Sequence, residues 1–343
     1  MSPRYPARAV SLAAIAVLGL GLAACSSSGG GSSASGKSSS SGSSSSSSGF
    51  TKKNLELVVG TKSDDFYITM ECGAEAEAKQ LGAKLTVNGP ADFSVSEQAP
   101  ILNSVAASKP DALMVAPTDA KALDPELQRI QSAGTKIVFV DTSSSDTSLG
   151  VSRISTDNVG GGKIAADNLG QQIGGKGTVA VINVNPGIST TDARIQGFNA
   201  EMKAKYPNVK VLGVQYDNDS SATAASQVAS DIAAHPDLNG VFATNVLSAQ
   251  GAATGVQHAG KSGKVKVATF DAEPQQIQFL KANTIQLAVA QDPYAEGQDA
   301  VQQALNAANG KTVTKAIGTP LTAITQANVN SASVQKYIYK SSC

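Results

Sequence analysis

The sequence predicts an α/β protein made of two doubly wound parallel-sheet lobes that are joined by a three-segment hinge. From Asn54 onward, short apolar runs alternate with longer amphipathic stretches, which is the pattern of strands connected by helices. The strands are almost continuously apolar, as in parallel sheets that helices cover on both faces. The alternation falls into two series that part near Gly150, and a chain of 343 residues suits two domains. A single (β/α)8 barrel is the rival fold, and it is less favoured because it needs eight regular units in one ring.

The first series begins with the apolar run Leu55–Val59, which predicts a strand. The following helix is predicted because Met70, Ala74 and Ala78 recur on one stripe at helical spacing. In order, the expected elements are strand 55–59, helix 67–81, strand 84–87, helix 96–107, strand 112–116, helix 123–133 and strand 136–140.

The second series has the same alternation and is longer. Its expected elements are helix 160–173, strand 178–182, helix 190–206, strand 209–214, helix 222–234, strand 240–243, helix 249–259, strand 265–270, helix 275–281, strand 285–290 and helix 295–308. A short C-terminal helix is expected over residues 333–339.

Three crossings between the lobes are expected, near residues 152–156, at Asp271 or Gln291, and near residues 318–322. The expected first lobe therefore combines residues 51–155 with 292–320. The expected second lobe combines residues 156–291 with 321–343.

The first 50 residues have the composition of an export signal followed by a tether. Arg4 and Arg8 precede an apolar run that ends in Leu22-Ala23-Ala24-Cys25, so residues 1–24 are expected to be a signal peptide. Leu-Ala-Ala-Cys resembles the bacterial lipobox, which implies lipidation of Cys25. The next 24 residues are 16 Ser, 6 Gly, Ala34 and Lys37, a composition that cannot bury a core. Residues 25–50 are therefore predicted to be a lipidated cysteine and a disordered tether, which would anchor an extracytoplasmic body to the membrane.

Polar side chains follow most of the predicted strands, at the point where each strand ends. In open parallel sheets, ligands bind at the carboxyl ends of the strands, so these side chains are expected to meet in a cleft between the two lobes. Carboxylates and amides can hydrogen-bond the hydroxyl groups of a sugar, and aromatic rings can cover its apolar face. The alternative for each residue alone is an ordinary turn or helix cap. The candidates are Asp64, Phe66, Tyr67, Asp141, Thr142, Arg194, Asn218, Asn245, Asp271 and Gln291.

At these residues the chain resembles the type 1 periplasmic-binding proteins of the ribose, xylose and galactose class, over about residues 54–322. The resemblance depends on several motifs that occur in order along the chain. They are Phe66-Tyr67, Val140-Asp141, Thr156-Asp157-Asn158-Val159-Gly160, Arg194-Ile195-Gln196-Gly197-Phe198, His235-Pro236-Asp237 before Val241-Phe242-Ala243-Thr244-Asn245, Ala268-Thr269-Phe270-Asp271, and Ala290-Gln291.

The resemblance implies a role for each matching position. Phe66 and Tyr67 would contact the sugar ring. The hydroxyl groups would be bound by polar residues, with Asp64 and Asn218 as weaker candidates than Asp141, Arg194, Asn245, Asp271 and Gln291. The family also implies delivery of the ligand to an ABC transporter permease, with no catalytic activity and no cofactor.

Three departures from the ribose binders disfavour ribose itself. Thr142 stands where an Arg is usual, Asp65 where a Pro is frequent, and Val246 where an acidic residue is usual. Several carboxylates against the single Arg194 also disfavour an anionic ligand, because like charges repel. A neutral pentose, hexose or polyol is expected, and a cationic polar ligand stays open.

Two further signals are interpreted as structural. Gly255–Ser262 satisfies the phosphate-loop pattern, but the predicted helix precedes it and the strand follows it, the reverse of what phosphate binding needs. His235 and His258 are expected at helix ends without a third partner, so no metal site is predicted.

The remaining cysteines, Cys72 and Cys343, form a possible disulfide that would hold the C-terminal helix to the first lobe. The hypothesis depends on export to an oxidising compartment, with Cys25 used for lipid. The alternative is a buried Cys72 and a loose tail.

The balanced charge of 27 Lys+Arg and 27 Asp+Glu argues against a nucleic-acid partner. The sequence therefore predicts a monomeric, lipid-anchored solute-binding protein of the cell membrane. Two alternatives stay open, a ligand-sensing receptor that serves a membrane sensor and an anchored enzyme that acts on sugars.

Overall fold

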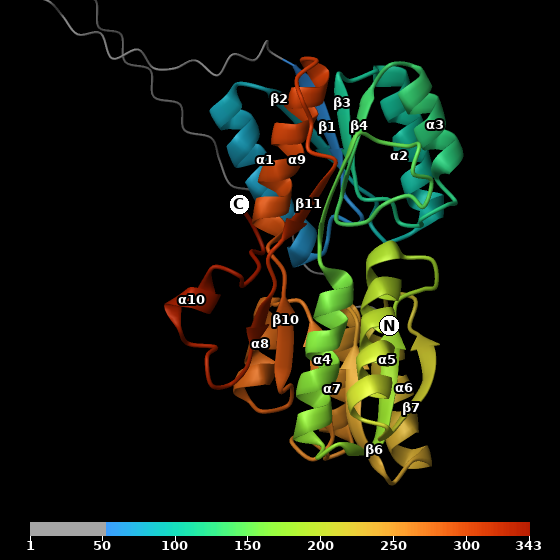
Figure 1. The fold of residues 1–343 in the computed structure, drawn as a ribbon, viewed down its shortest axis with the longest axis vertical. Coiled ribbons are helices and arrows are strands. Elements are labelled where there is room, and N and C mark those ends of the chain that lie inside the picture. Colours follow the sequence, from blue (N-terminus) through green and yellow to red (C-terminus); the bar gives the residue numbers. More distant parts are fainter. Residues whose placement is uncertain (1–52) are drawn as a thin grey trace, which may run out of the picture. The chain divides into compact units, whose positions relative to one another are not determined.

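The computed structural model describes residues 53–343, and these contain two six-stranded sheets, each flanked by helices (Figure 1). The expected signal peptide, Cys25 and the tether lie outside the described residues. The first sheet has the strand order β11-β5-β4-β3-β1-β2, and all its pairs are parallel. The second sheet has the order β12-β10-β9-β8-β6-β7, and only the β10–β12 pair is antiparallel. This is the predicted pair of doubly wound lobes.

The first lobe is the first sheet with the helices that pack on it. Its elements are β1 (Asn54–Val58), α1 (Asp65–Leu81), β2 (Lys84–Asn88), α2 (Val95–Ser108), β3 (Ala112–Val115), α3 (Asp124–Ser132), β4 (Lys136–Val140), β5 (Ser152–Thr156), α9 (Pro293–Ala308) and β11 (Ala316–Thr319). Helix α9 belongs here because it packs against β3, β4 and α1.

The second lobe is the second sheet with its helices. Its elements are α4 (Asn158–Gln172), β6 (Lys176–Asn183), α5 (Ser189–Lys205), β7 (Asn208–Tyr216), α6 (Ser221–Ala234), β8 (Leu238–Ala243), α7 (Val246–His258), β9 (Lys266–Phe270), α8 (Pro274–Lys281), β10 (Leu287–Ala290) and β12 (Thr322–Ile324). The short helix α10 (Ala332–Gln335) follows β12.

The strands bury their side chains on both faces, which is why they read as continuous apolar runs. All residues of β3 and β10 are buried, and only the first residue of β1 is exposed. In the second lobe, the rings of Phe198 and Phe242 stack at 4.4 Å between centroids. Burial on both faces fixes each sheet between its helices and leaves the strand ends free to carry polar residues.

Two glycines allow α1 and α9 to lie in direct contact (Figure 1). A Cβ atom on Gly73 would stand 2.0 Å from the carbonyl oxygen of Tyr294, and one on Gly297 would stand 2.1 Å from that of Met70. Both positions therefore need glycine because of the neighbouring backbone, although neither has an unusual φ. This contact joins α1 to a helix that follows strands β6 to β10 of the second sheet.

The chain crosses between the sheets after β5, after β10 and after β11. Of the two positions expected for the middle crossing, Gln291 is right and Asp271 is wrong, because β10 still pairs with β9 after Asp271. Residues 152–156 and 318–322 were expected only as connections. The first range forms strand β5, and the second contains the end of β11 and the start of β12. The pattern did not predict them because they are short and partly polar.

The expected C-terminal helix over residues 333–339 is too long. Helix α10 ends at Gln335, and the chain then turns until the backbone N–H of Tyr339 donates to the carbonyl of Ala272 at 3.1 Å. The hydrogen bond to Ala272 of the second lobe thus takes the place of a further helical turn.

Candidate functional site

A cavity lies between the carboxyl ends of the two sheets, where the sequence predicted a ligand site. Both lobes contribute to its wall. The lining residues are Asp64, Phe66, Tyr67, Phe93, Asp141 and Thr142 from the first lobe, and Val184, Ile188, Thr190, Thr191, Arg194, Asp219, Asn245, Asp271 and Gln291 from the second lobe and the crossing after β10.

The first turn of α1 supplies the aromatic wall. Asp64 is the N-cap of the helix, and its Oδ1 accepts a hydrogen bond from the backbone N–H of Phe66 at 2.7 Å. This cap fixes the start of the helix, and Phe66 and Tyr67 are therefore placed one after the other at the cavity. Their rings meet edge to face at 5.1 Å, and Phe93 stacks on Tyr67 at 6.4 Å. Together the three rings form an apolar surface of the kind that covers a sugar ring.

Asp141 follows β4 and is held by Tyr67. The Tyr67 hydroxyl donates to Asp141 Oδ2 at 2.7 Å, and both side chains are buried. Burial raises the pKa of Asp141 to about 6, although the nearby Arg194 charge and the Tyr67 hydrogen bond both oppose that rise. Burial and the Asp141 charge in turn raise the pKa of Tyr67, so its hydroxyl stays protonated and acts as a donor.

Arg194 projects from α5 and is 3% exposed. Its Nε donates to Asn158 Oδ1 at 2.8 Å and its Nη1 donates to the Thr244 carbonyl at 2.7 Å. The guanidinium also lies over the Phe270 ring at 4.1 Å and 3.9 Å from Asp271 Oδ2. The guanidinium is therefore fixed from several sides before any ligand arrives.

Asp271 follows β9 and has a left-handed backbone, with φ 76°. Its Oδ1 accepts from Gln291 Nε2 at 2.7 Å and from the Tyr339 hydroxyl at 2.8 Å. The oxygen of the Gln291 amide, Oε1, is buried and has no hydrogen-bond partner among residues 53–343. Because buried polar atoms are seldom left unpaired, this acceptor is available to a ligand hydroxyl.

Asn245 is the N-cap of α7, with its Oδ1 accepting from Ser248 N–H at 3.0 Å. Its Nδ2 donates to Asp219 Oδ1 at 2.8 Å. Burial raises the pKa of Asp219. Asn245 therefore lines the cavity and also holds the neighbouring Asp219 in the cavity wall.

Nine of the ten predicted residues line this one cavity, and Asn218 does not. Asn218 lines a larger adjoining cavity, which shares Asp64, Phe93 and Asp219 with the first. Its neighbour Asp219 lines the first cavity, and both residues have a left-handed backbone, with φ 55° and 56°.

The sequence interpretation missed six other lining residues, which are Phe93, Val184, Ile188, Thr190, Thr191 and Asp219. Phe93 lies in the loop before α2, and Thr190 and Thr191 in the first turn of α5. The Oγ1 of Thr191 is buried and has no hydrogen-bond partner in the described part of the chain, so it is another available hydrogen-bonding atom. The cluster Asp217-Asn218-Asp219 after β7 did indicate the region of Asp219, but not that residue itself.

The cavity wall is acidic. Asp64, Asp141, Asp219 and Asp271 line it against the single guanidinium of Arg194. Burial raises the pKa of Asp64 well above its usual range, and the charge of Asp271 adds to the rise. An anionic ligand would add to this repulsion, whereas hydroxyl groups can donate to the carboxylates.

A buried cluster links two crossings next to the cavity. Glu296 of α9 is fully buried, and its Oε1 accepts from the hydroxyls of Thr156 and Thr319, each at 2.9 Å. The Oε2 atom has no hydrogen-bond partner among the residues that the structure describes. Burial raises the pKa of Glu296 to about 8, and the charge of Asp141 adds to the rise. We call Thr156, Glu296 and Thr319 the crossing cluster, because the two threonines end β5 and β11.

The two lobes are in hydrogen-bonding contact beside the cavity. The backbone N–H of Ala120 donates to the Gly187 carbonyl at 3.0 Å, and that of Ser143 donates to Ser189 Oγ at 3.0 Å. Because each bond joins a first-lobe residue to a second-lobe residue, the structure has the lobes in a closed arrangement.

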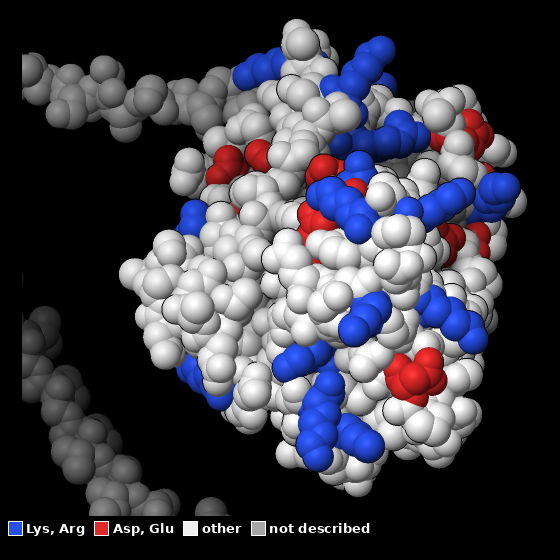
Figure 2. Space-filling view, turned by 60° about the horizontal axis from the view of Figure 1, so that its bottom comes forward, with Lys and Arg blue, Asp and Glu red and all other residues white. Residues whose placement is uncertain are grey.

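Residues 53–343 lack the features of two other functions. No group of three or more His, Cys, Asp or Glu residues there could hold a metal ion, and no helix there is long and apolar enough to cross a membrane. Figure 2 shows lysine and arginine side chains spread over one face, with a few acidic groups between them.

Two α/β lobes with a polar and aromatic cavity between their strand ends define a two-lobed solute-binding protein. Residues 55–312 match the family described as periplasmic binding protein domain, and the chain belongs to that family. The predicted family and fold are thereby confirmed.

The relatives are sugar-binding proteins of bacteria. The chain is 29% identical to the ribose import binding protein of Bacillus subtilis, over 79% of this chain and 86% of the relative. It is 31% identical to the D-ribose/D-allose-binding protein of Pseudomonas aeruginosa, over 64% of this chain and 71% of the relative. These relatives are named as binding proteins, in agreement with the prediction that the chain is not an enzyme.

A solved structure is more similar. An ABC transporter solute-binding protein from Agrobacterium vitis, bound with α-D-tagatopyranose, is 42% identical with a TM-score of 0.82, and the match covers 84% of this chain and all of that one. A second protein from the same organism, with bound D-fucose, is 28% identical with a TM-score of 0.80 over 83% of this chain.

Proposed function

We propose that this protein captures a neutral monosaccharide or polyol in the cavity between its lobes and delivers it to an ABC importer. The observation that carries the proposal is the convergence of nine predicted residues, from both lobes, on one cavity with an aromatic wall and several carboxylates. Hydroxyl groups would donate to the carboxylates, Arg194 would donate to a ring or hydroxyl oxygen, and Phe66, Tyr67 and Phe93 would cover the apolar face.

The sugars bound by the relatives support the substrate class and suggest the panel for a first test. D-Tagatose, D-fucose, D-arabinose, D-allose and D-ribose would be titrated calorimetrically, with an anionic sugar such as D-glucuronate as the charge control. At least one neutral sugar should bind tightly, and D-glucuronate should not. Failure of every neutral sugar and polyol, with binding of an anion instead, would overturn the proposal.

Two matched variants test whether this cavity is the site. Asp141→Asn removes a charged acceptor from the wall, and we expect the Kd to rise by about 10- to 100-fold. Asn218→Asp is the control, because Asn218 lines only the adjoining cavity. A similar loss in both variants would place the ligand elsewhere.

Hinged closure of the lobes is part of the proposed mechanism, with first-lobe residues 51–155 and 292–320 moving against second-lobe residues 156–291 and 321–343. The interlobe bonds at Gly187 and Ser189 would form on closure and hold the form that docks on the permease. Small-angle scattering should show compaction when the sugar is added. An unchanged radius with saturating ligand would contradict the closure step.

We also propose that the mature protein is a lipoprotein on the outer face of the cell membrane, held through Cys25, and that it acts as a monomer. The support is the Leu-Ala-Ala-Cys motif after an apolar run, followed by a Ser/Gly tether. Cells fed a labelled fatty acid should incorporate the label into the wild-type chain but not into Cys25→Ala. Equal labelling of both chains would refute the anchor.

A further inference from the structure

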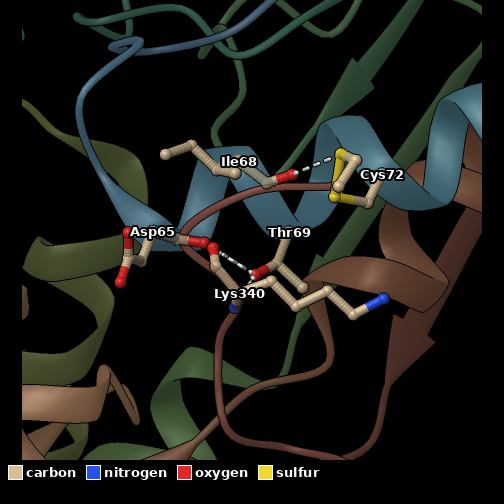
Figure 3. Close-up of a disulfide and its surroundings, with 6 residues drawn as sticks. Asp65, Ile68, Thr69, Cys72 and Lys340 are labelled. Carbon is tan, nitrogen blue, oxygen red and sulfur yellow. Dashed lines mark hydrogen bonds between the residues drawn. A yellow bond between two sulfur atoms is a disulfide. The ribbon is translucent and has the colours of Figure 1, made fainter.

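The last eight residues, 336–343, which we call the C-terminal tail, contact both lobes at adjacent positions. The backbone N–H of Tyr339 donates to the Ala272 carbonyl of the second lobe at 3.1 Å. The next residue, Lys340, donates its backbone N–H to Thr69 Oγ1 on α1 of the first lobe at 2.7 Å (Figure 3). The tail therefore crosses between the lobes a fourth time, beside the three crossings of the sheets.

The end of the tail is held firmly on α1. Ser341 Oγ donates to Asp65 Oδ2 at 2.9 Å, and Cys343 forms a disulfide with Cys72, one turn beyond Thr69 (Figure 3). These contacts fix the tail on the same helix whose first turn carries Phe66 and Tyr67. The position of Tyr339 is thus determined from both of its sides.

Tyr339 itself lies behind the sugar cavity and is 3% exposed. Its ring meets Phe66 edge to face at 5.7 Å. Its hydroxyl donates to Asp271 Oδ1 at 2.8 Å and accepts from the backbone N–H of Gln291 at 3.3 Å. Tyr339 is absent from the cavity wall, yet it touches three of the residues that form it.

The two oxygens of the Asp271 carboxylate have different partners. Oδ1 already accepts from Tyr339 and Gln291, whereas Oδ2 has only the Arg194 guanidinium at 3.9 Å. Two donors on one oxygen fix the orientation of the carboxylate of Asp271, which lines the cavity. A preorganised acceptor of this kind strengthens binding because less ordering remains for the ligand to impose.

We propose that Tyr339 is a positioning residue of the ligand site, which orients Asp271 and the Gln291 backbone through its hydroxyl and is itself held in place by the disulfide-linked tail. This inference builds on the proposed function, because it assigns to the tail a part in the affinity for the sugar. Through the C-terminal tail, Asp271 of the second lobe is connected to α1 of the first lobe.

The test compares two tyrosines of the same tail. Tyr339→Phe removes the hydroxyl and keeps the ring, whereas Tyr337→Phe makes the same change two residues earlier, where the ring contacts Lys336. For the sugar of the panel that binds the wild-type protein most tightly, calorimetry should show a Kd about tenfold higher for Tyr339→Phe and unchanged for Tyr337→Phe. An unchanged Kd for Tyr339→Phe, or equal losses in both variants, would overturn the proposal.

A double-variant cycle distinguishes positioning from general packing. If Tyr339 acts through Asp271, its substitution should weaken binding little further in the background of Asp271→Asn. Independent losses that multiply in the double variant would contradict an action through Asp271.

A measurement without ligand keeps this inference separate from the proposed function. Hydrogen exchange of the Gln291 amide should be about tenfold faster in Tyr339→Phe than in Tyr337→Phe, because the amide loses its acceptor. If no sugar binds the wild-type protein, the proposed function fails and the exchange result alone decides the positioning role. Equal exchange in the two variants would then refute it.

Discussion

Replacement of the buried Glu296 by Gln should change how the stability of the protein depends on pH. The carboxyl is fully buried in the crossing cluster, where two threonine hydroxyls donate to one of its oxygens and the other oxygen has no partner. Glutamine has the same shape and keeps an oxygen for the two threonines. It differs from the carboxyl in having no charge at any pH.

The magnitude follows from the pKa of the Glu296 carboxyl, which burial raises from its ordinary value of 4.5 to about 8 in the fold. Below pH 4.5 the group is protonated in both the folded and the unfolded chain, so its ionisation makes no contribution to the free energy of unfolding. As the pH rises from 4.5 to about 8, the unfolded chain loses the proton and the folded chain keeps it, so stability falls. Above that range the full loss is on the order of 5 kcal/mol, an upper bound from about 1.4 kcal/mol per pH unit.

Urea unfolding at pH values from 5 to 9 would measure the effect. We expect wild type and Glu296→Gln to differ little at pH 5 and by several kcal/mol at pH 8.5, with the variant more stable. Glu75→Gln, an exposed change on α1, is the control and should follow the wild-type curve. Parallel curves for wild type and Glu296→Gln would show that the buried carboxyl is not the group that titrates.

Three other predictions concern the disulfide, the helix contact and the site. Changing Cys72 and Cys343 together to Ser should lower the free energy of unfolding, measured in urea, by about 2–5 kcal/mol. Reduction of the wild-type protein should also lower it. Equal stability of the variant and the oxidised wild type would refute the stabilising role of the disulfide. Gly73→Ala should cost about 1–3 kcal/mol because its Cβ would meet a backbone oxygen, whereas Gly213→Ala, with open space around it, should cost little. Sugar affinity should fall as the pH drops through about 6, because Asp141 then becomes protonated and loses an acceptor, and calorimetry of Asp141→Asn should lack that step.

Much of the fold was predictable because burial on both sheet faces leaves a strong pattern in the sequence. The run Leu287–Ala290 is apolar throughout and was expected as a strand, and the structure has it as β10. Strand β5 was not predicted, because only alternate residues of Ser152–Thr156 are buried and several are polar. Helix α10 was predicted too long. The hydrogen bond from Tyr339 to Ala272 joins residues far apart in sequence, so no local pattern predicts it.

The site was predictable where chemistry and strand ends coincide. Asp141 and Asp271 each stand directly after a buried strand, and both line the cavity. Asp219 was missed in favour of its neighbour Asn218, because the choice depends on two left-handed residues in the turn. Tyr339 carries no signal of its own, since it reaches Asp271 only after the chain has folded back across 68 positions.

The return of α9 and β11 to the first sheet has a consequence for the order in which the protein folds during synthesis. Strands β6 to β10 follow one another along the chain, so the second sheet lacks only its edge strand β12 once Ala290 has been made. The first sheet has five strands long before that point, but its β3 and β4 lack the helix α9 that covers them. The first sheet can therefore complete its packing only after α9 has been synthesised. Until then its apolar surface is exposed, and a chaperone or an early partner could bind it.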